Sequence, residues 1–228
     1  MVKTVFLDLD DTILDFHQAE KQALSRTLRQ FDIDPTPAAL DRYHELNRRQ
    51  WELLEERKIT RPQVLTRRFD LLFQELGAAV SSEEVCAVYE AYLSRGHFFM
   101  PGAPELLETL SARYALYLAS NGAAAVQAGR LDSAGIRRYF QNIFISEKMG
   151  ADKPSAAFFR ACFDAIPRFD PAASVMVGDS LTSDIRGARD AGLRTCWYNP
   201  QGQPPRPDIV PDHTVRDLGE IPALLASL

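Results

Sequence analysis

Apolar and polar residues follow two different patterns along this chain, one typical of strands and one typical of helices. Residues 2–7 form a short run rich in Val, Thr and Phe that ends abruptly in acidic residues, which is typical of a buried strand that stops at a polar loop. From about Phe16 to Gly96 no similar run occurs, and apolar residues recur at helical spacing instead. This pattern predicts a helical segment inserted between the first strand and the remainder of a sheet.

Four amphipathic stripes fill the helical segment, and breakers at Pro35, Pro37 and Gly77 separate them. Residues Thr60–Gln63 and Ser81–Glu84 both fit capping boxes at helix starts. The stripes consist of Leu24, Leu28 and Phe31; Leu40, Tyr43, Trp51 and Leu54; Leu65, Phe69, Leu72 and Leu76; and Val85, Val88, Tyr89 and Tyr92. The spacing predicts a four-helix insert.

After Pro101-Gly102 short apolar runs alternate with helical stretches. Strands are expected at 115–119, 142–145, 174–177 and near 194–197, with helices at 104–112, 123–134, 156–165 and 183–191. The Pro-rich run 200–211 is expected to be an irregular loop before a last short strand and a helix over 218–226. Such alternation predicts an α/β fold, with a Rossmann-like parallel sheet and helices on both faces. Residues 1–15 and 97–228 would form this discontinuous core domain, and residues 16–96 an inserted cap domain.

Composition narrows the class of protein further. The 228 residues are 46% hydrophobic and 25% charged, close to ordinary globular values. Apolar runs are too short for a membrane helix and no signal peptide is apparent, so a cytoplasmic protein without membrane contact is expected. A net charge of −5 argues against a nucleic-acid polymer as partner. Three widely spaced cysteines are expected to be buried thiols: Cys86, Cys162 and Cys196.

Polar side chains gather where the predicted strands end. Ligands of open parallel sheets bind beyond the carboxyl ends of the strands. The residues at these positions are Asp8, Asp10, Asp11 and Thr12 after the first strand; Ser120, Asn121 and Gly122 after the second; Lys153 and Pro154 after the third; and Asp179, Ser180 and Asp184 after the fourth. Complementary groups from four strand ends therefore point to one ligand site.

Each of these features also has a simpler interpretation. A D-x-D triplet arises by chance about once in a chain of this length. Asp15 is expected to cap a helix, residues 120–122 could form a plain turn, and Lys153 alone would usually be a solvated surface residue. The order and placement of the four groups, rather than any one of them, favour a functional site.

The grouping has a chemical logic. Three converging carboxylates need a hard dication such as Mg²⁺ to stay ionised together. A phosphate brought to that cation requires further donors, which the Ser120 hydroxyl, the Lys153 ammonium and nearby backbone amides could provide. Asp8 could attack phosphorus and form an aspartyl-phosphate, while Asp10, two residues further on an extended backbone, could act as general acid and then base.

At these residues the sequence resembles the haloacid dehalogenase superfamily. Its first motif, D-x-D-x-T, is matched at residues 8–12, and its later motifs are matched by Ser120, Lys153, Asp179 and Asp184. The resemblance implies a nucleophile and an acid/base in the first motif, and phosphate binding by the second and third motifs, including Asn121. It further implies Mg²⁺ held by the Asp8 carboxylate, the Asp10 carbonyl and Asp179, with Asp184 acting directly or through water. The helical insert resembles the family's cap, which closes over substrate and excludes water.

Within the superfamily, the presence of Asp10 favours phosphatases over the metal-independent 2-haloacid dehalogenases, which lack this acid. Several stretches resemble bacterial pyrimidine 5′-nucleotidases: Asn47 with Trp51, Arg68 with Phe69, residues 145–154, and residues 195–199. Asp11 stands where many relatives have glycine. The alternatives are a phosphoglycolate or sugar-phosphate phosphatase or phosphomutase, a 2-haloacid dehalogenase, and a binding module without catalytic activity.

The cap contains candidate specificity residues. Asn47 interrupts an apolar stripe, so Asn47 and Trp51 are predicted to face the substrate, with Arg68 contacting ribose or phosphate. In the alternative interpretation leucines fill the cap core and leave Asn47 and Arg68 in solvent. The sequence thus predicts a small-molecule phosphate ester as the substrate of a monomeric or homodimeric enzyme.

Overall fold

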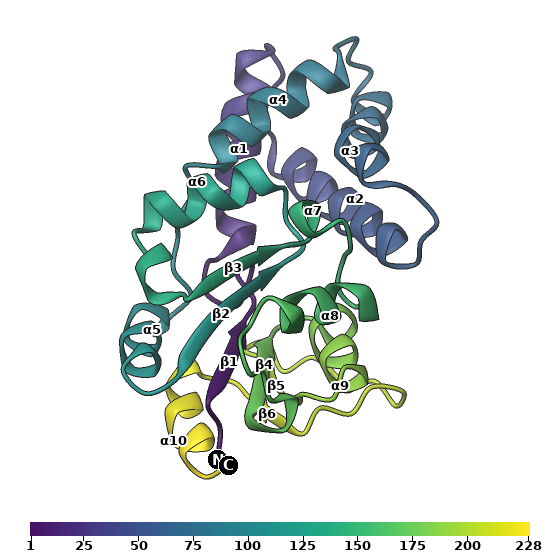
Figure 1. Ribbon diagram of the computed structural model, residues 1–228. Helices are drawn as coiled ribbons and strands as arrows, with labels where there is room; N and C mark the ends of the chain where they lie inside the picture. Colours follow the sequence, from purple (N-terminus) through teal and green to yellow (C-terminus); the bar gives the residue numbers. More distant parts are fainter.

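A six-stranded parallel sheet forms the centre of the molecule (Figure 1). The computed structural model describes residues 1–228, and its strands lie in the order β3-β2-β1-β4-β5-β6. The strands are β1 (Thr4–Leu7), β2 (Ala115–Ser120), β3 (Asn142–Ile145), β4 (Ser174–Gly178), β5 (Arg194–Tyr198) and β6 (His213–Val215). The chain order reverses its direction across the sheet between β1 and β4, so the switch point where ligands bind in such sheets lies between these two strands.

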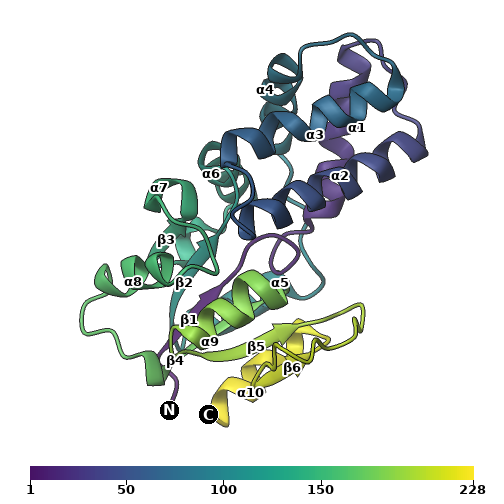
Figure 2. The same ribbon diagram turned by 90° about the vertical axis from the view of Figure 1, so that its right-hand side faces the viewer.

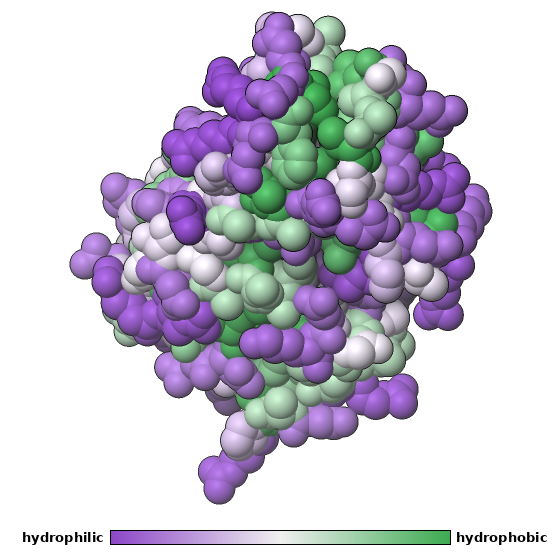
Figure 3. Space-filling model, turned by 90° about the horizontal axis from the view of Figure 1, so that it is seen from above, coloured by the Kyte–Doolittle hydropathy of each residue, from purple (hydrophilic) through white to green (hydrophobic).

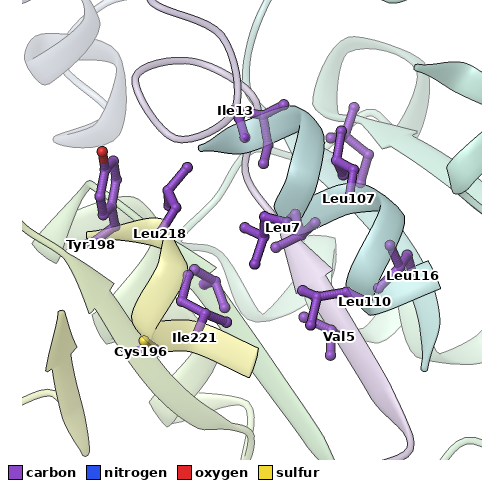
Figure 4. Close-up of a cluster of buried hydrophobic side chains, with 14 of the residues drawn as sticks. Val5, Leu7, Ile13, Leu107, Leu110, Leu116, Cys196, Tyr198, Leu218 and Ile221 are labelled. Carbon is purple, nitrogen blue, oxygen red and sulfur yellow. The ribbon is translucent and has the colours of Figure 1, made fainter. Parts of the chain in front are cut away.

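Helices cover both faces of the sheet because successive strand residues point to opposite sides. Val5 and Leu7 belong to an apolar cluster with Leu107, Leu110 and Ile221 on one face (Figure 4), while the Phe6 side chain belongs to an aromatic-rich cluster on the other face. The helices of this region are α5 (Ala103–Ser111), α6 (Ala124–Ala134), α7 (Ser146–Met149), α8 (Ala156–Asp164), α9 (Gly187–Asp190) and α10 (Ile221–Ala226).

Four helices between β1 and α5 form a separate layer beyond the carboxyl ends of the strands, at the opposite end of the molecule from both termini (Figures 1 and 2). They are α1 (Phe16–Gln30), α2 (Pro37–Glu55), α3 (Arg61–Leu76) and α4 (Ser82–Leu93). Leu24, Tyr43, Phe69, Leu72 and Tyr89 are fully buried in a core of their own. The insert therefore packs around an apolar centre that is separate from the two clusters on the sheet faces and that takes one buried residue, Val126, from α6.

Local caps explain where the inserted helices begin. The Asp15 carboxylate accepts a 2.7 Å hydrogen bond from the backbone N–H of Gln18, as predicted, and Thr60 and Gln63 form a capping box at α3. Helix α3 ends at Gly77, whose φ of 65° is the left-handed conformation that glycine adopts without steric cost. The same short-range signals that punctuate the sequence thus set the lengths of these helices.

The predicted fold class is confirmed, and two helices differ from their predicted form. The stretch predicted as one helix over 183–191 is a π-helix over Leu181–Arg186 followed by α9, and the last helix begins as a 3₁₀ turn over Leu218–Glu220. The wider, π-helical turns occur preferentially at functional sites.

No helix has the length and apolar character required to cross a membrane. Seen from the end of the molecule where the inserted helices lie, polar side chains surround a partly apolar centre (Figure 3).

Candidate active site

The ends of β1 and β4 place three carboxylates together at the switch point of the sheet. Leu7 pairs with Val177 in the parallel register, so Asp8 and Asp179 follow their strands side by side. Ligand oxygens of Asp8, Asp179 and Asp184 all lie within 4.8 Å of one another. The structure thus brings together acidic residues that are up to 176 positions apart in the sequence.

The Lys153 ammonium group lies among these carboxylates. Its Nζ donates hydrogen bonds of 2.6 Å to Asp8 Oδ1, 2.7 Å to Asp184 Oδ1 and 2.6 Å to the carbonyl of Ala119. The residue is only 2% exposed, so its interpretation as a surface lysine is wrong. All three N–H groups are engaged, and the ammonium therefore fixes the orientation of two acids at once.

The π-helical turn after β4 explains how Asp184 reaches this position. Its Oδ2 accepts a 3.1 Å hydrogen bond from the Ser180 N–H, and the carboxylate lies directly against the backbone of Gly178. A Cβ atom added at Gly178 would be 2.2 Å from that oxygen, so only glycine leaves room for it. Both oxygens of Asp184 are therefore already bonded to protein donors.

Asp8, Asp179, Asp184 and Lys153 at the strand ends form what we call the rim of the sheet. Its charges are unbalanced, because three buried or half-buried acids share one lysine. Burial raises the pKa of Asp8 to about 8, with Lys153 lowering it and Asp184 raising it. Burial also raises the pKa of Asp179 well above its usual range, and both neighbouring carboxylates raise it further. Burial alone would lower the pKa of Lys153, but the two acids raise it. The site without a cation thus disfavours full ionisation of its acids.

The donor set fits a magnesium ion. Mg²⁺ prefers hard oxygen ligands, and a dication would offset the excess negative charge that burial makes unfavourable here. Asp8 and Asp179 each have carboxylate oxygens that accept no protein hydrogen bond. Asp184 differs from them, because each of its carboxylate oxygens already accepts one protein hydrogen bond.

The Asp10 carboxylate lines the same cavity but is held by different residues. Arg130 of α6, a fully buried guanidinium, forms an ion pair with Asp10 Oδ1, and Gln127 Nε2 donates a 2.6 Å hydrogen bond to Oδ2. Gln127 Nε2 also lies 2.9 Å from Ser120 Oγ. One face of α6 therefore fixes side chains that follow both β1 and β2.

Ser120 and Asn121 have distinct environments after β2. Ser120 Oγ accepts hydrogen bonds from Gly122 N at 3.1 Å and from Gln127, which leaves its own hydroxyl hydrogen free to donate. The Asn121 amide instead bonds both backbone groups of Lys153, each at 2.9 Å. Asn121 thereby joins the second and third strand ends.

Two further contacts fix the acidic loops. Trp197 Nε1 donates a 2.7 Å hydrogen bond to the backbone carbonyl of Asp179 and so positions the loop after β4. Asp11 adopts a left-handed φ of 55°, and its carboxylate accepts a 2.9 Å hydrogen bond from Phe16 N at the start of α1. Asp11 therefore connects the first motif to the beginning of the insert.

A cavity of about 220 Å³ lies between the strand ends and the inserted helices. The strand ends contribute Asp8, Asp10, Ser120 and Asp179, among others. The inserted helices contribute Trp51, Glu55, Leu65, Arg68 and Glu90. The acids are thus enclosed on the opposite side by a wall that combines apolar, aromatic and charged side chains.

Of the predicted specificity residues, Trp51 and Arg68 line the cavity and Asn47 does not. Asn47 is 3% exposed, and its Oδ1 accepts hydrogen bonds from Trp51 Nε1 at 3.1 Å and Arg68 Nη1 at 2.9 Å. Its Nδ2 donates to Glu20 Oε1 at 2.7 Å. The amide that was predicted to meet the substrate therefore lies behind the wall. The alternative that Asn47 and Arg68 are solvated is also wrong, since both are buried.

Arg61 and Glu55 connect the inserted helices to the strand ends. Arg61 donates hydrogen bonds to the Asn121 carbonyl at 2.9 Å and to Ser146 Oγ at 2.6 Å, and it pairs with Asp152. Glu55 Oε2 accepts a 2.8 Å hydrogen bond from Thr182. These contacts join α2 and α3 to the loops that follow the strands.

Sequence reasoning missed three residues that act on the site from other elements, namely Gln127, Arg130 and Arg61, and it noted Trp197 only as part of a stretch that resembles the nucleotidases. Gln127 and Arg130 are three residues apart on a helix that also carries Val126 and Leu131. Polar residues at that spacing, on a helix directly after a strand-end motif, were the available signal. Arg61 offered none, because Pro62 and the capping box already accounted for its surroundings.

The fold and the site together define a class of hydrolase. A model of the haloacid dehalogenase-like hydrolase family matches residues 2–192, and the chain belongs to that family.

Individual relatives narrow the comparison. The chain is 38% identical to the pyrimidine 5′-nucleotidase PynA of Streptococcus pneumoniae, over 87% of this chain and 84% of that protein. It is 30% identical to the pyrimidine 5′-nucleotidase YjjG of Escherichia coli, over 97% and 96% of the two chains. These relatives confirm the resemblance to the pyrimidine nucleotidase branch.

A solved structure supports the fold. YfnB of Bacillus subtilis, a HAD-hydrolase by name, shares 37% identity and superposes with a TM-score of 0.95 over 98% of each chain. That crystal structure is described as bound to magnesium and as revealing interdomain movement.

Proposed function

We propose that the chain is a Mg²⁺-dependent phosphomonoesterase that hydrolyses pyrimidine nucleoside 5′-monophosphates through an aspartyl-phosphate on Asp8. The observation that carries the proposal is the arrangement of two carboxylates from one strand end. Asp8 is held by Lys153 among the other acids, and Asp10 is held by Arg130 at the same cavity. The names of two relatives supply the substrate class.

Asp8 is the proposed nucleophile. Lys153 engages Oδ1, so Oδ2 remains available to attack phosphorus. Attack forms an O–P bond to Asp8 and breaks the bond between phosphorus and the ester oxygen of the substrate. Splitting hydrolysis into this step and a later attack by water replaces one difficult step with two easier ones.

Asp10 is the proposed acid and base. It would deliver a proton to the departing nucleoside oxygen and then take one from the water that attacks the aspartyl-phosphate. Arg130 and Gln127 hold its two oxygens, which fixes the direction of the carboxylate before substrate arrives. The phosphate oxygens would accept a hydrogen bond from the free Ser120 hydroxyl and from nearby backbone N–H groups, with Lys153 contributing its charge.

Asp8, Asp179 and the Asp10 carbonyl would hold Mg²⁺, with Asp184 supporting it through water. When bound, the ion neutralises the acids and draws negative charge away from the transferring phosphoryl group.

The inserted helices, residues 16–96, would form a cap domain over a core made of residues 1–15 and 97–228. Trp51 offers a flat surface for stacking a base, and Arg68 lies beside it in the cavity wall. Asn47 would position both side chains rather than contact the base itself. A cap that brings these groups to the substrate would also exclude water from the phosphoryl transfer.

A phosphate-release assay with Mg²⁺ tests the substrate class. UMP, dUMP and TMP are expected to be hydrolysed with a higher kcat/KM than phosphoglycolate, glyceraldehyde 3-phosphate or hexose phosphates. A preference for one of the latter compounds would contradict the nucleotidase assignment while leaving the phosphatase assignment intact.

The chemistry needs a separate test against the alternatives. Halide release from 2-haloacids in EDTA would identify a dehalogenase, and movement of phosphate on a sugar without release would identify a mutase. Absence of turnover with every ester would indicate a binding module. With ³²P-labelled substrate, acid-quenched Asp10→Asn protein is expected to retain label, because its aspartyl-phosphate breaks down slowly. Label that is equally retained by Asp8→Asn would exclude Asp8 as the site of the intermediate.

A further inference from the structure

Two histidines and a glutamate converge at the base of the inserted helices. His17 and Glu20 lie three residues apart on α1, and His44 faces them from α2. Nδ1 of His44 lies 2.6 Å from Glu20 Oε2 and 3.3 Å from Nδ1 of His17. Potential ligand atoms of all three residues lie within 4.8 Å of one another.

We propose that His17, Glu20 and His44 form a second metal site, which binds a transition-metal dication such as Zn²⁺ and is distinct from the acidic site at the sheet. Two imidazoles and one carboxylate are a ligand set found in zinc sites with an open fourth position. The inference goes beyond the proposed function and does not depend on it.

The spacing of the ring nitrogens supports a tetrahedral ion. Two nitrogens that are each about 2.0–2.1 Å from a tetrahedral Zn²⁺ lie roughly 3.3 Å apart, and the Nδ1 atoms of His17 and His44 are 3.3 Å apart. The two rings are nearly perpendicular, with an interplanar angle of 83°, so the nitrogens approach each other without stacking of the ring faces. A small movement of Glu20 would complete the third ligand.

One hydrogen on His44 Nδ1 cannot serve both of its close contacts. A neutral imidazole carries one N–H, and a Nδ1–H of His44 directed at Glu20 cannot also point at His17. The 3.3 Å contact between the two Nδ1 atoms is then not bridged by that hydrogen. A metal ion in place of that hydrogen would accept a lone pair from all three residues at once.

The surroundings already resemble those of a metal site. Metal-ligating carboxylates are usually oriented by a further hydrogen bond, and Asn47 donates such a bond to the second oxygen of Glu20. Glu20 is 2% exposed, whereas His17 is exposed and the His44 side chain is 36% exposed. The buried carboxylate provides a fixed anchor, and the open side leaves room for a water ligand and for entry of the ion.

The site would also act on the cavity. Glu20 bonds Asn47, which in turn bonds Trp51 and Arg68 in the cavity wall. A cation at Glu20 would fix α1 to α2 and stabilise the direction of that chain of hydrogen bonds.

Metal binding to the full chain tests the proposal, with saturating Mg²⁺ present to occupy the acidic site. Equilibrium dialysis is expected to give one Zn²⁺ per chain, and Co²⁺ should show the strong visible absorption of four-coordinate cobalt with nitrogen ligands. His17→Ala and His44→Ala should each weaken Zn²⁺ binding by at least about tenfold. The matched control is His97→Ala, which removes another exposed histidine and should bind as the unaltered protein does.

A second variant separates the two sites. Asp179→Asn should lower Mg²⁺ affinity and leave the Co²⁺ absorption unchanged. Loss of the Co²⁺ absorption in Asp179→Asn, or undiminished Zn²⁺ binding in both histidine variants, would overturn the proposal. So would the absence of bound Zn²⁺ in the unaltered protein.

Discussion

The sheet rim and the inner wall of the inserted helices face one cavity, but their charged side chains are compensated in different ways. At the rim, Asp8, Asp179 and Asp184 share a single lysine, and burial raises the pKa values of Asp8 and Asp179. In the wall, the Arg68 guanidinium is buried against aromatic rings and bonded to a neutral amide. The rim is therefore suited to bind a cation from solution, whereas the wall is held together by its own residues.

This difference predicts that the rim serves mainly turnover, whereas the wall also contributes to the stability of the fold. Buried like charges cost stability and persist where chemistry needs them, while a completed hydrogen-bond network contributes to folding. Substitutions in the rim should then impair turnover without unfolding the protein. Substitutions in the wall should do both.

The largest effect is expected for Asp8→Asn. Loss of the proposed nucleophile should lower kcat by roughly 10⁴-fold or more. Because the buried carboxylate is unfavourable without a cation, the variant should unfold in EDTA at the same temperature as the unaltered protein or at a higher one. Phosphate release and thermal unfolding check the two parts. Asp164→Asn, at an exposed position, is the control and should alter neither. Marked destabilisation by Asp8→Asn would contradict the contrast between rim and wall.

The second largest effect is expected for Arg68→Ala, on stability. The change removes a buried side chain that bonds Asn47 and lies over the Phe69 and Tyr89 rings, 5.2 and 5.1 Å from their centroids. The free energy of unfolding should fall by about 2–4 kcal/mol, as measured by urea denaturation. The neighbouring Arg67→Ala is the matched control, because Arg67 is exposed on the same helix. Equal stability of the two variants would show that the wall is not held by Arg68.

Residues 8, 153 and 179 could be located from the sequence because short-range rules fix them. Strands of parallel sheets end at one edge, so the motifs that follow them meet there whatever the length of the insert. Arg130 could not be assigned to Asp10 in this way. The two residues are 120 positions apart, and their contact depends on how closely α6 packs against the loop that follows β1.

The wall shows the same limit in another form. The polar break at Asn47 marked a special position in an apolar stripe, but periodicity does not tell which neighbour satisfies a buried amide. Three side chains from three helices do so, namely Glu20, Trp51 and Arg68. The four-helix arrangement could be predicted from spacing and caps, whereas the bonds between its helices depend on tertiary packing.

A smaller effect is expected for Arg61→Ala, which tests the junction between the two regions. Arg61 bonds the Asn121 carbonyl and Ser146 Oγ, and its guanidinium lies 5.3 Å from the Trp51 ring centroid. Without Arg61 the inserted helices should be positioned less accurately over the strand ends. The value of kcat/KM for UMP should therefore fall roughly tenfold. Metal affinity and unfolding temperature should change little.

The control for the junction is Arg48→Ala, which removes an exposed arginine that pairs only with Glu52 on α2. Equal kcat/KM values for Arg61→Ala and Arg48→Ala would mean that the junction does not contribute to turnover. A large loss of Mg²⁺ affinity in Arg61→Ala would instead mean that the rim depends on the wall for its own geometry.

The smallest effect concerns His44 and depends on pH. Its hydrogen bond to Glu20 raises the pKa of His44, although partial burial lowers it. A raised pKa in the folded state means that the protonated pair stabilises the protein below the ordinary histidine pKa of about 6.5. This contribution is lost as pH rises through the higher folded value. In EDTA, the unaltered protein should therefore melt above His44→Ala at pH 5.5 by about 1–2 °C, because the pair is partly exposed and screened. The gap should close toward pH 9, and a gap that is constant across this range would show that His44 stabilises α2 by packing rather than by charge.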